Sequence, residues 1–201
     1  MLGVRRPTRP GGRSTGPFRY NGKHRFFYAD NFALSSMIVA SRILIVIATQ
    51  TLTRLAGGRV MAEYSVSTGL NGVGELQGSG CTPRGLHRVR LRIGADCPVG
   101  TVFRARRPTG EVYGPALAAA YPDRDWILTR ILWLTGCESG RNRGGQMDTL
   151  RRFIYIHGCP DIAPMGSPRS HGCIRMRNAD LVELFDATAV GTQVEIRECE
   201  P

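Results

Sequence analysis

The sequence predicts one β-rich domain with a single late helix. Its 201 residues are enough for one domain with a sizeable core. Most apolar segments are short, rich in β-branched residues and bounded by glycine or proline, which is typical of strands. Only segment 178–187 has a clear helical apolar period, and the sequence contains no internal repeat.

The expected strands follow from alternating hydrophobicity and from the turn residues between them. Gly57 and Gly58 predict a hairpin turn. Segment 70–85 contains five glycines and is expected to be a long loop, and segment 108–125 is rich in turn residues. The β-branched and aromatic residues of segment 126–134 favour a strand over a helix. The expected strands are 42–48, 50–55, 59–67, 86–93, 100–106, 126–134, 151–158 and 191–198.

The helix expected at 178–187 has a polar start and one apolar face. Asn178 is expected to cap its first turn. Asp180 and Asp186 fall outside the apolar face. That face comprises Leu181, Val182, Leu184 and Phe185.

The formal charge of +11 is unevenly distributed along the chain. Residues 1–36 contain seven basic residues and one acid and so carry +6, while the remaining 165 residues carry +5. The leading segment is rich in proline, glycine and arginine, and we expect it to be disordered or extended. Two interpretations of residues 1–36 stay open: translation begun upstream of the working start, or a basic arm for an anionic polymer. Residues 37–201 are the predicted domain.

The basic residues of the domain do not predict a nucleic-acid partner. Arg88, Arg90 and Arg92 alternate along one expected strand, and no aromatic residues interleave to stack bases. We interpret this row as a solvated strand face. No stretch reaches the roughly 20 apolar residues of a transmembrane helix. Segment 37–52 lacks the cleavage site of an export signal and is better interpreted as containing a buried strand.

Reactive groups concentrate in segments 155–161 and 170–175. Cys173 is the candidate nucleophile, because a thiol needs a partner that accepts its proton and two histidines are near it in sequence or by topology. His157 ends an expected strand, and His171 lies two residues before the cysteine. Gly172 permits a sharp turn that presents N–H groups to an oxyanion, and Arg175 suits a substrate carboxylate.

Other interpretations of the same segments stay open. Four possible zinc ligands are His157, Cys159, His171 and Cys173. The single residue within each pair is shorter than the usual zinc-site spacing, which favours the nucleophile. A Cys159–Cys173 disulfide would block that nucleophile. The simplest alternative is a glycine-rich structural loop with a buried cysteine, but it leaves the clustering of reactive groups unexplained. The chain is too long to require a disulfide framework for its six cysteines.

Segments IHG (156–158) and SHGCIRM (170–176) resemble the signature of the L,D-transpeptidase catalytic domain, the YkuD family. The resemblance extends over roughly residues 42–197 and includes YSVSTG (64–69), TPRGLH (82–87) and LVELFDATAVGTQVEI (181–196). It implies a mixed-sheet, β-sandwich-like domain. It also implies a bacterial cell-wall enzyme of the envelope or periplasm, which acts on peptidoglycan stem peptides and so contributes to peptidoglycan biosynthesis and cell shape.

The resemblance assigns roles to the residues of both segments. Cys173 is implied as the acylated nucleophile and His157 as its general base, oriented by the Gly158 carbonyl. The N–H groups of Gly172 and Cys173 are implied to stabilise the oxyanion. Ser170 and His171 are implied to shape the loop and Arg175 to hold substrate. No cofactor or metal is implied.

Two features depart from the family pattern. Cys159 stands where a small hydroxyl residue is expected, which raises the prospect of oxidative pairing with Cys173. An export signal and a wall-binding module are not evident in the sequence. The alternatives are a carboxypeptidase or amidase that hydrolyses the same acyl-enzyme, and a non-catalytic wall-binding domain. The sequence leaves the acceptor and the oligomeric state open.

Overall fold

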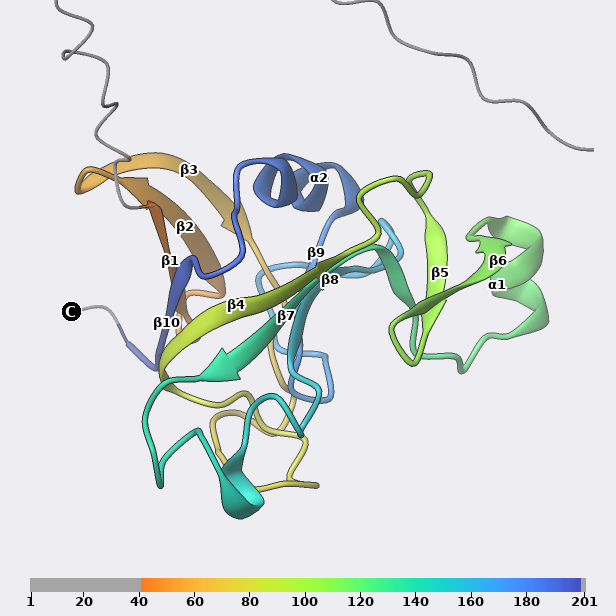
Figure 1. The fold of residues 1–201 in the computed structure, drawn as a ribbon. Coiled ribbons are helices and arrows are strands. Elements are labelled where there is room, and N and C mark those ends of the chain that lie inside the picture. Colours follow the sequence, from red (N-terminus) through yellow and green to blue (C-terminus); the bar gives the residue numbers. More distant parts are fainter. Residues whose placement is uncertain (1–40, 200–201) are drawn as a thin grey trace, which may run out of the picture. The chain divides into compact units, whose positions relative to one another are not determined.

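The computed structural model describes residues 41–199, whose ten strands form one open, mixed sheet (Figure 1). The expectations for residues 1–36 lie outside this range. The strand order is β3-β2-β1-β10-β4-β7-β5-β6, with β8 paired to β7 and β9 paired to β8. The predicted mainly β class with a mixed sheet is confirmed.

The elements have the following bounds. The first five strands are β1 (Ser41–Val46), β2 (Thr51–Ala56), β3 (Arg59–Ser65), β4 (Gly85–Ile93) and β5 (Thr101–Arg104). The other five are β6 (Arg107–Val112), β7 (Ile127–Gly136), β8 (Tyr155–Gly158), β9 (Ile174–Met176) and β10 (Gln193–Arg197). The helices are α1 (Pro115–Ala120), the short 3-10 helix η1 (Gly145–Met147) and α2 (Asn178–Asp186).

Two parallel strand pairs make the sheet mixed. β1 pairs with β10 and β8 pairs with β9 in parallel, whereas the other pairs are antiparallel. The apolar segment at the start of the described chain is an interior strand, since β1 lies between β2 and β10. Figure 1 shows β1, β2 and β3 at one end of the sheet and β5, β6 and α1 at the other.

The late helix packs on the sheet through its apolar face. Leu181, Leu184 and Phe185 are fully buried in the main core, and α2 contacts β7 and β8. The predicted helix is confirmed, but Asn178 does not cap it. Arg177 occupies the N-cap position, and the Asn178 side-chain amide donates to the Cys159 carbonyl at 2.9 Å. The Asn178 side chain therefore bonds to a buried carbonyl outside the helix and not to the N–H groups of the first helical turn.

Segment 107–120 differs from the sequence expectation. It forms β6 and the short helix α1, where only turns were expected. Strand β6 pairs only with β5, and an edge strand needs little hydrophobic alternation and tolerates Pro108. Pro115 stands in the first turn of α1, and the alanines that follow favour a helix. None of the α1 residues is buried, which is why no apolar period marks it in the sequence.

The arginines of β4 lie on the surface. Arg88, Arg90 and Arg92 are exposed, as a solvated face requires. Arg92 also donates to the Phe185 carbonyl near the end of α2 at 2.9 Å, where a cation is favourable. Neither α-helix of residues 41–199 has the length and hydropathy needed to cross a membrane.

Candidate active site

Alternation along β8 and β9 separates a core face from a site face. Ile156, Ile174 and Met176 point into the main core. His157 is paired with Arg175 in the parallel register, and paired residues of neighbouring strands point to the same side. Cys173 precedes Arg175 by two residues and packs against Tyr155 on that side. Cys173, His157 and Arg175 therefore lie on the same side of these two adjacent strands.

The thiol of Cys173 lies between two backbone groups. The Tyr155 N–H donates to Sγ at 3.4 Å, and Sγ donates to the Phe153 carbonyl at 3.4 Å. Burial raises the pKa of Cys173 to about 12, although the Tyr155 N–H acts in the opposite direction. The sulfur is therefore a neutral thiol at neutral pH.

An aromatic stack fixes the carbonyl that contacts this thiol. Phe153 has φ +58°, which is uncommon for a residue other than glycine, and it ends the turn before β8. The Arg106 guanidinium lies 4.7 Å from the Phe153 ring and 4.8 Å from the Trp133 ring. Segment 151–153 is a turn and not the start of a strand as expected, and this turn directs the Phe153 carbonyl to the thiol.

His157 is buried and held in one orientation. Its ring is 2% exposed, and Nδ1 lies 2.9 Å from the Gly158 carbonyl. This contact assigns the proton to Nδ1 and leaves the Nε2 lone pair as the acceptor. Burial lowers the pKa of His157 to about 4, although the Gly158 carbonyl and the Asp125 charge act in the opposite direction. The imidazole is therefore neutral and able to accept a proton.

The turn before Cys173 is closed by Ser170. Its hydroxyl donates to the Cys173 carbonyl at 2.5 Å and accepts the Gly172 N–H at 3.1 Å. Thr82 holds the same turn from outside, donating from Oγ1 to the Gly172 carbonyl at 3.0 Å. The Gly172 N–H is thus engaged by Ser170 in this conformation, and its implied role at an oxyanion stays a prediction.

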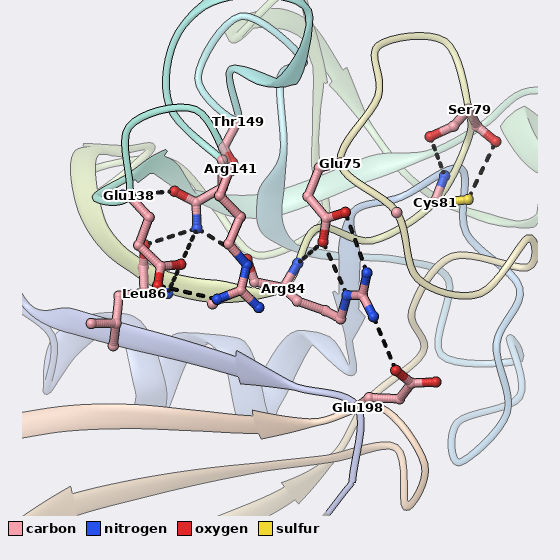
Figure 2. Close-up of polar contacts among 12 residues, drawn as sticks. Glu75, Ser79, Cys81, Arg84, Leu86, Glu138, Arg141, Thr149 and Glu198 are labelled. Atoms are coloured by element: carbon pink, nitrogen blue, oxygen red, sulfur yellow. Dashed lines mark hydrogen bonds and ion pairs between the residues drawn. The ribbon is translucent and has the colours of Figure 1, made fainter.

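A polar network anchors the glycine-rich loop that supplies Thr82. Figure 2 shows Arg84 between Glu75 and Glu198, with ion-pair distances of 3.0 and 3.1 Å. Glu138 accepts the Leu86 N–H at 3.1 Å at the start of β4 (Figure 2). These contacts fix both ends of segment 75–86, so Thr82 is held against the turn of the candidate nucleophile.

Arg175 is already paired, by a residue that sequence reasoning missed. Asp125 accepts from its guanidinium at 2.6 Å and contacts His171 Nδ1 at 3.1 Å. Burial works to raise the pKa of Asp125, but the Arg175 and His171 charges hold it below its usual range. Arg175 also donates to the Arg169 carbonyl at 3.1 Å. Two contacts thus engage its guanidinium while Nε has no partner among the described residues, and the implied role of Arg175 in holding substrate stays a prediction.

His171 does not contact the thiol. Its side chain is 80% exposed and lies between two surface cavities. One, of about 250 Å³, is lined by Asp125 and Arg175, and the other, of about 440 Å³, by Arg152 and Phe153. Both cavities therefore border His171, two residues before the candidate nucleophile.

The structure does not bring Cys159 to Cys173. The Cys159 N–H donates to the Met176 carbonyl at 3.2 Å, and Met176 lies three residues beyond Cys173, or about 10 Å along the strand. A disulfide needs Cα atoms within about 7 Å. Both sulfurs are free thiols, and burial raises the pKa of Cys159 to about 11. The oxidative pairing considered from the sequence is therefore excluded by this geometry.

The four residues considered as zinc ligands are also kept apart. His171 is turned toward Asp125, and Cys159 lies beyond the end of β9. Within residues 41–199, no three His, Cys, Asp or Glu side chains are grouped so as to hold a metal ion. The arrangement instead offers a thiol, a neutral imidazole on the same face and a glycine turn.

The chain belongs to the family of L,D-transpeptidase catalytic domains, because the model of that family, YkuD, matches residues 40–196. This range contains the candidate site and the whole sheet except Arg197, the last residue of β10. A comparison with curated proteins gave no match.

Solved structures resemble the chain in fold. An L,D-transpeptidase from Mycobacterium smegmatis is 18% identical with a TM-score of 0.47, over 79% of this chain and 58% of its own. The L,D-transpeptidase of Xylanimonas cellulosilytica is 21% identical with a TM-score of 0.46, over 78% and 60%. Bd1075 of Bdellovibrio bacteriovorus is 16% identical with a TM-score of 0.50, over 81% and 49%. The chain thus spans about half to three fifths of these proteins, and the likeness concerns the fold.

Proposed function

We propose that this protein is a peptidoglycan L,D-transpeptidase whose catalytic domain is residues 37–201 and which works in the cell envelope. The observation that carries the proposal is the placement of Cys173 and His157 on one face of neighbouring strands, with His157 Nδ1 directed at Gly158. Family membership supports the reaction class. The donor is a tetrapeptide stem, and the acceptor is an amine.

Acylation begins from a neutral thiol and a neutral imidazole. Cys173 Sγ attacks the carbonyl carbon of the diamino acid's L-centre, and His157 Nε2 accepts the thiol proton as the C–S bond forms. The Gly158 carbonyl stabilises the resulting imidazolium through Nδ1–H. Collapse of the tetrahedral intermediate breaks the C–N bond. The leaving D-alanine amine takes the proton back from His157, and a thioester remains on Cys173.

The second half-reaction regenerates the thiol. An acceptor amine attacks the thioester carbonyl and passes a proton to His157, and the C–S bond breaks as the new amide forms. His157 then returns the proton to the sulfur. Water in place of the amine would instead give a carboxypeptidase, so exclusion of water from the thioester decides between the two outcomes.

The test is incubation of the full-length protein with a tetrapeptide stem and an amine acceptor, followed by mass spectrometry. We expect release of D-alanine, an acyl adduct on Cys173 and a cross-linked product. Cys173→Ala should abolish all three, whereas Cys199→Ala, which removes an exposed thiol, should leave them unchanged. D-alanine release without cross-linking would support the hydrolase. Full activity of Cys173→Ala would refute the mechanism.

A further inference from the structure

Arg152 is a half-buried cation without an anionic partner among residues 41–199. Its guanidinium donates to the carbonyls of Gly74 at 3.0 Å and Cys81 at 2.6 Å and approaches Ser79 Oγ at 3.5 Å. None of the ion pairs within residues 41–199 includes it. A guanidinium has five N–H donors, so at most three are used by these contacts. Arg152 therefore keeps both its full charge and free donors.

Two neighbours place this guanidinium beside the candidate nucleophile. The Cys81 carbonyl oxygen that accepts from Arg152 also packs against Gly172, so closely that a Cβ there would lie 2.8 Å from it. On the other side, the next residue in the chain is Phe153, whose carbonyl contacts Cys173 Sγ. The guanidinium thus contacts a carbonyl that packs on the residue before Cys173, and it interacts electrostatically with Cys173 itself.

The nearby charges leave Arg152 uncompensated. Glu75 interacts with it electrostatically, but its carboxylate is engaged by Arg84 through 3.0 and 3.4 Å hydrogen bonds (Figure 2). The other arginine of the site, Arg175, is neutralised by Asp125. The cavity of about 440 Å³ at Arg152 has Arg151 as its only other formally charged lining residue among those described. It is therefore a cationic cavity next to a thiol, and burial of a cation favours recruitment of an anion.

We propose that this cavity binds the C-terminal carboxylate of the donor peptide and that Arg152 is the residue that selects for it. The inference rests on the proposed transpeptidase function. In a tetrapeptide stem the terminal carboxylate carbon is three bonds from the scissile carbonyl carbon, or about 4 Å away. When that carbonyl lies at Cys173 Sγ, the carboxylate must therefore lie close to the nucleophile. A charge-assisted bond from Arg152 then holds the leaving D-amino acid during acylation.

The first test compares two donors in the full-length protein, a tetrapeptide stem with a free terminal carboxylate and the same stem with a terminal amide. The wild type should acylate from the acid with a kcat/KM about 10- to 100-fold higher. Arg152→Gln should remove most of this preference by lowering kcat/KM for the acid alone, and Arg152→Lys should retain part of it. The control is Arg143→Gln, an exposed arginine whose loss should leave the preference intact. Equal wild-type rates for both donors, or an equal fall for both in Arg152→Gln, would overturn the proposal.

The second test requires no turnover. Cys173→Ala protein is titrated by calorimetry with N-acetyl-D-alanine and with its amide. The acid should bind to the Cys173→Ala protein at least tenfold more tightly than the amide. In the double variant Cys173→Ala/Arg152→Gln the two affinities should be equal. Circular dichroism verifies that both variants are folded. Equal affinity for acid and amide would refute the carboxylate site. This measurement does not depend on catalysis. If the protein formed no product, the proposed transpeptidase function would be disproved, but the binding result would still decide the role of Arg152.

Discussion

Replacing Gly172 by alanine should displace the candidate nucleophile. Gly172 has φ +111°, well outside the left-handed range that other residues adopt. The new Cβ would lie 2.8 Å from the Cys81 carbonyl oxygen and 3.4 Å from Ile154 Cδ1. Neither side is free to move, because Arg152 holds the Cys81 carbonyl and Thr82 holds the carbonyl of Gly172 itself. The strain must therefore be relieved by shifting the turn that carries the thiol.

The cost follows from two separate effects. Backbone strain at such a φ is about 1–3 kcal/mol, and overpacking against a fixed carbonyl adds about 1–3 kcal/mol. Gly172→Ala should thus lower the free energy of unfolding by about 2–6 kcal/mol. The matched control is Gly166→Ala, because Gly166 has φ +77° but nothing within 4 Å of the position of a Cβ. Gly166→Ala should lower the free energy of unfolding only through backbone strain, by about 1–2 kcal/mol.

The assay is urea unfolding of both variants together with the rate of Cys173 alkylation by iodoacetamide. Gly172→Ala should be the less stable of the two and should change the alkylation rate, whereas Gly166→Ala should alkylate as the wild type does. The reasoning fails if the two variants lose equal stability and leave the alkylation rate unchanged, because the Cys81 carbonyl would then not restrain the turn.

Three further predictions concern charged and titrating groups. The pKa of His157 is lowered to about 4, so the single-turnover acylation rate should be retained down to about pH 5 and fall with a midpoint near pH 4 as the imidazole gains a proton. A midpoint near pH 6.5 would contradict this. Asp125→Asn should lower the free energy of unfolding by about 1–2 kcal/mol, since Asp125 is 45% exposed but Arg175, only 15% exposed, is left without an anion. In an Arg175→Met background only the exposed contact with His171 is lost, so the cost should fall below about 0.5 kcal/mol. Equal costs in both backgrounds would exclude the Arg175–Asp125 pair. The pKa of buried His87 is also lowered to about 4. Between pH 6.5 and 4 the unfolded chain binds a proton there that the native protein does not, so this group removes about 3 kcal/mol of stability as the pH falls. His87→Gln should remove that share of the pH dependence, and an unchanged dependence would disprove the assignment.

Local patterns predicted most of the sheet, including the edge strand β3, but not the strands β6 and β9. The interior strands alternate or are continuously apolar, and burial on one or both faces enforces those patterns. Strand β6 and helix α1 bury almost nothing, so their sequence has no hydrophobic period to detect. Asn178 shows the opposite case. Its capping signal is genuine, but the Cys159 carbonyl, far from it in sequence, accepts its side chain instead.

The candidate site divides in the same way. Cys173 and His157 were chosen from residue chemistry and from the resemblance, and their catalytic roles stay predictions. Asp125 was missed. It lies two residues before β7, which pairs with β8, so the strand pairing places this acid near His157, but the sequence alone does not reveal that pairing. Arg152 was missed because nothing in RRFIYIHG distinguishes a buried guanidinium from a solvated one.

The sequence by itself determined the residue chemistry of the turn and which side chains share a face within each strand, because alternation is a local property of the extended backbone. Tertiary structure decided which of those faces meet. The parallel register of β8 and β9 places Arg175 beside His157, and that register depends on pairing across a loop. Burial, which only the assembled sheet provides, sets the pKa values of His157 and Cys173. It also leaves one arginine, Arg175, paired with an aspartate, and another, Arg152, lining a cavity without an ion pair among residues 41–199.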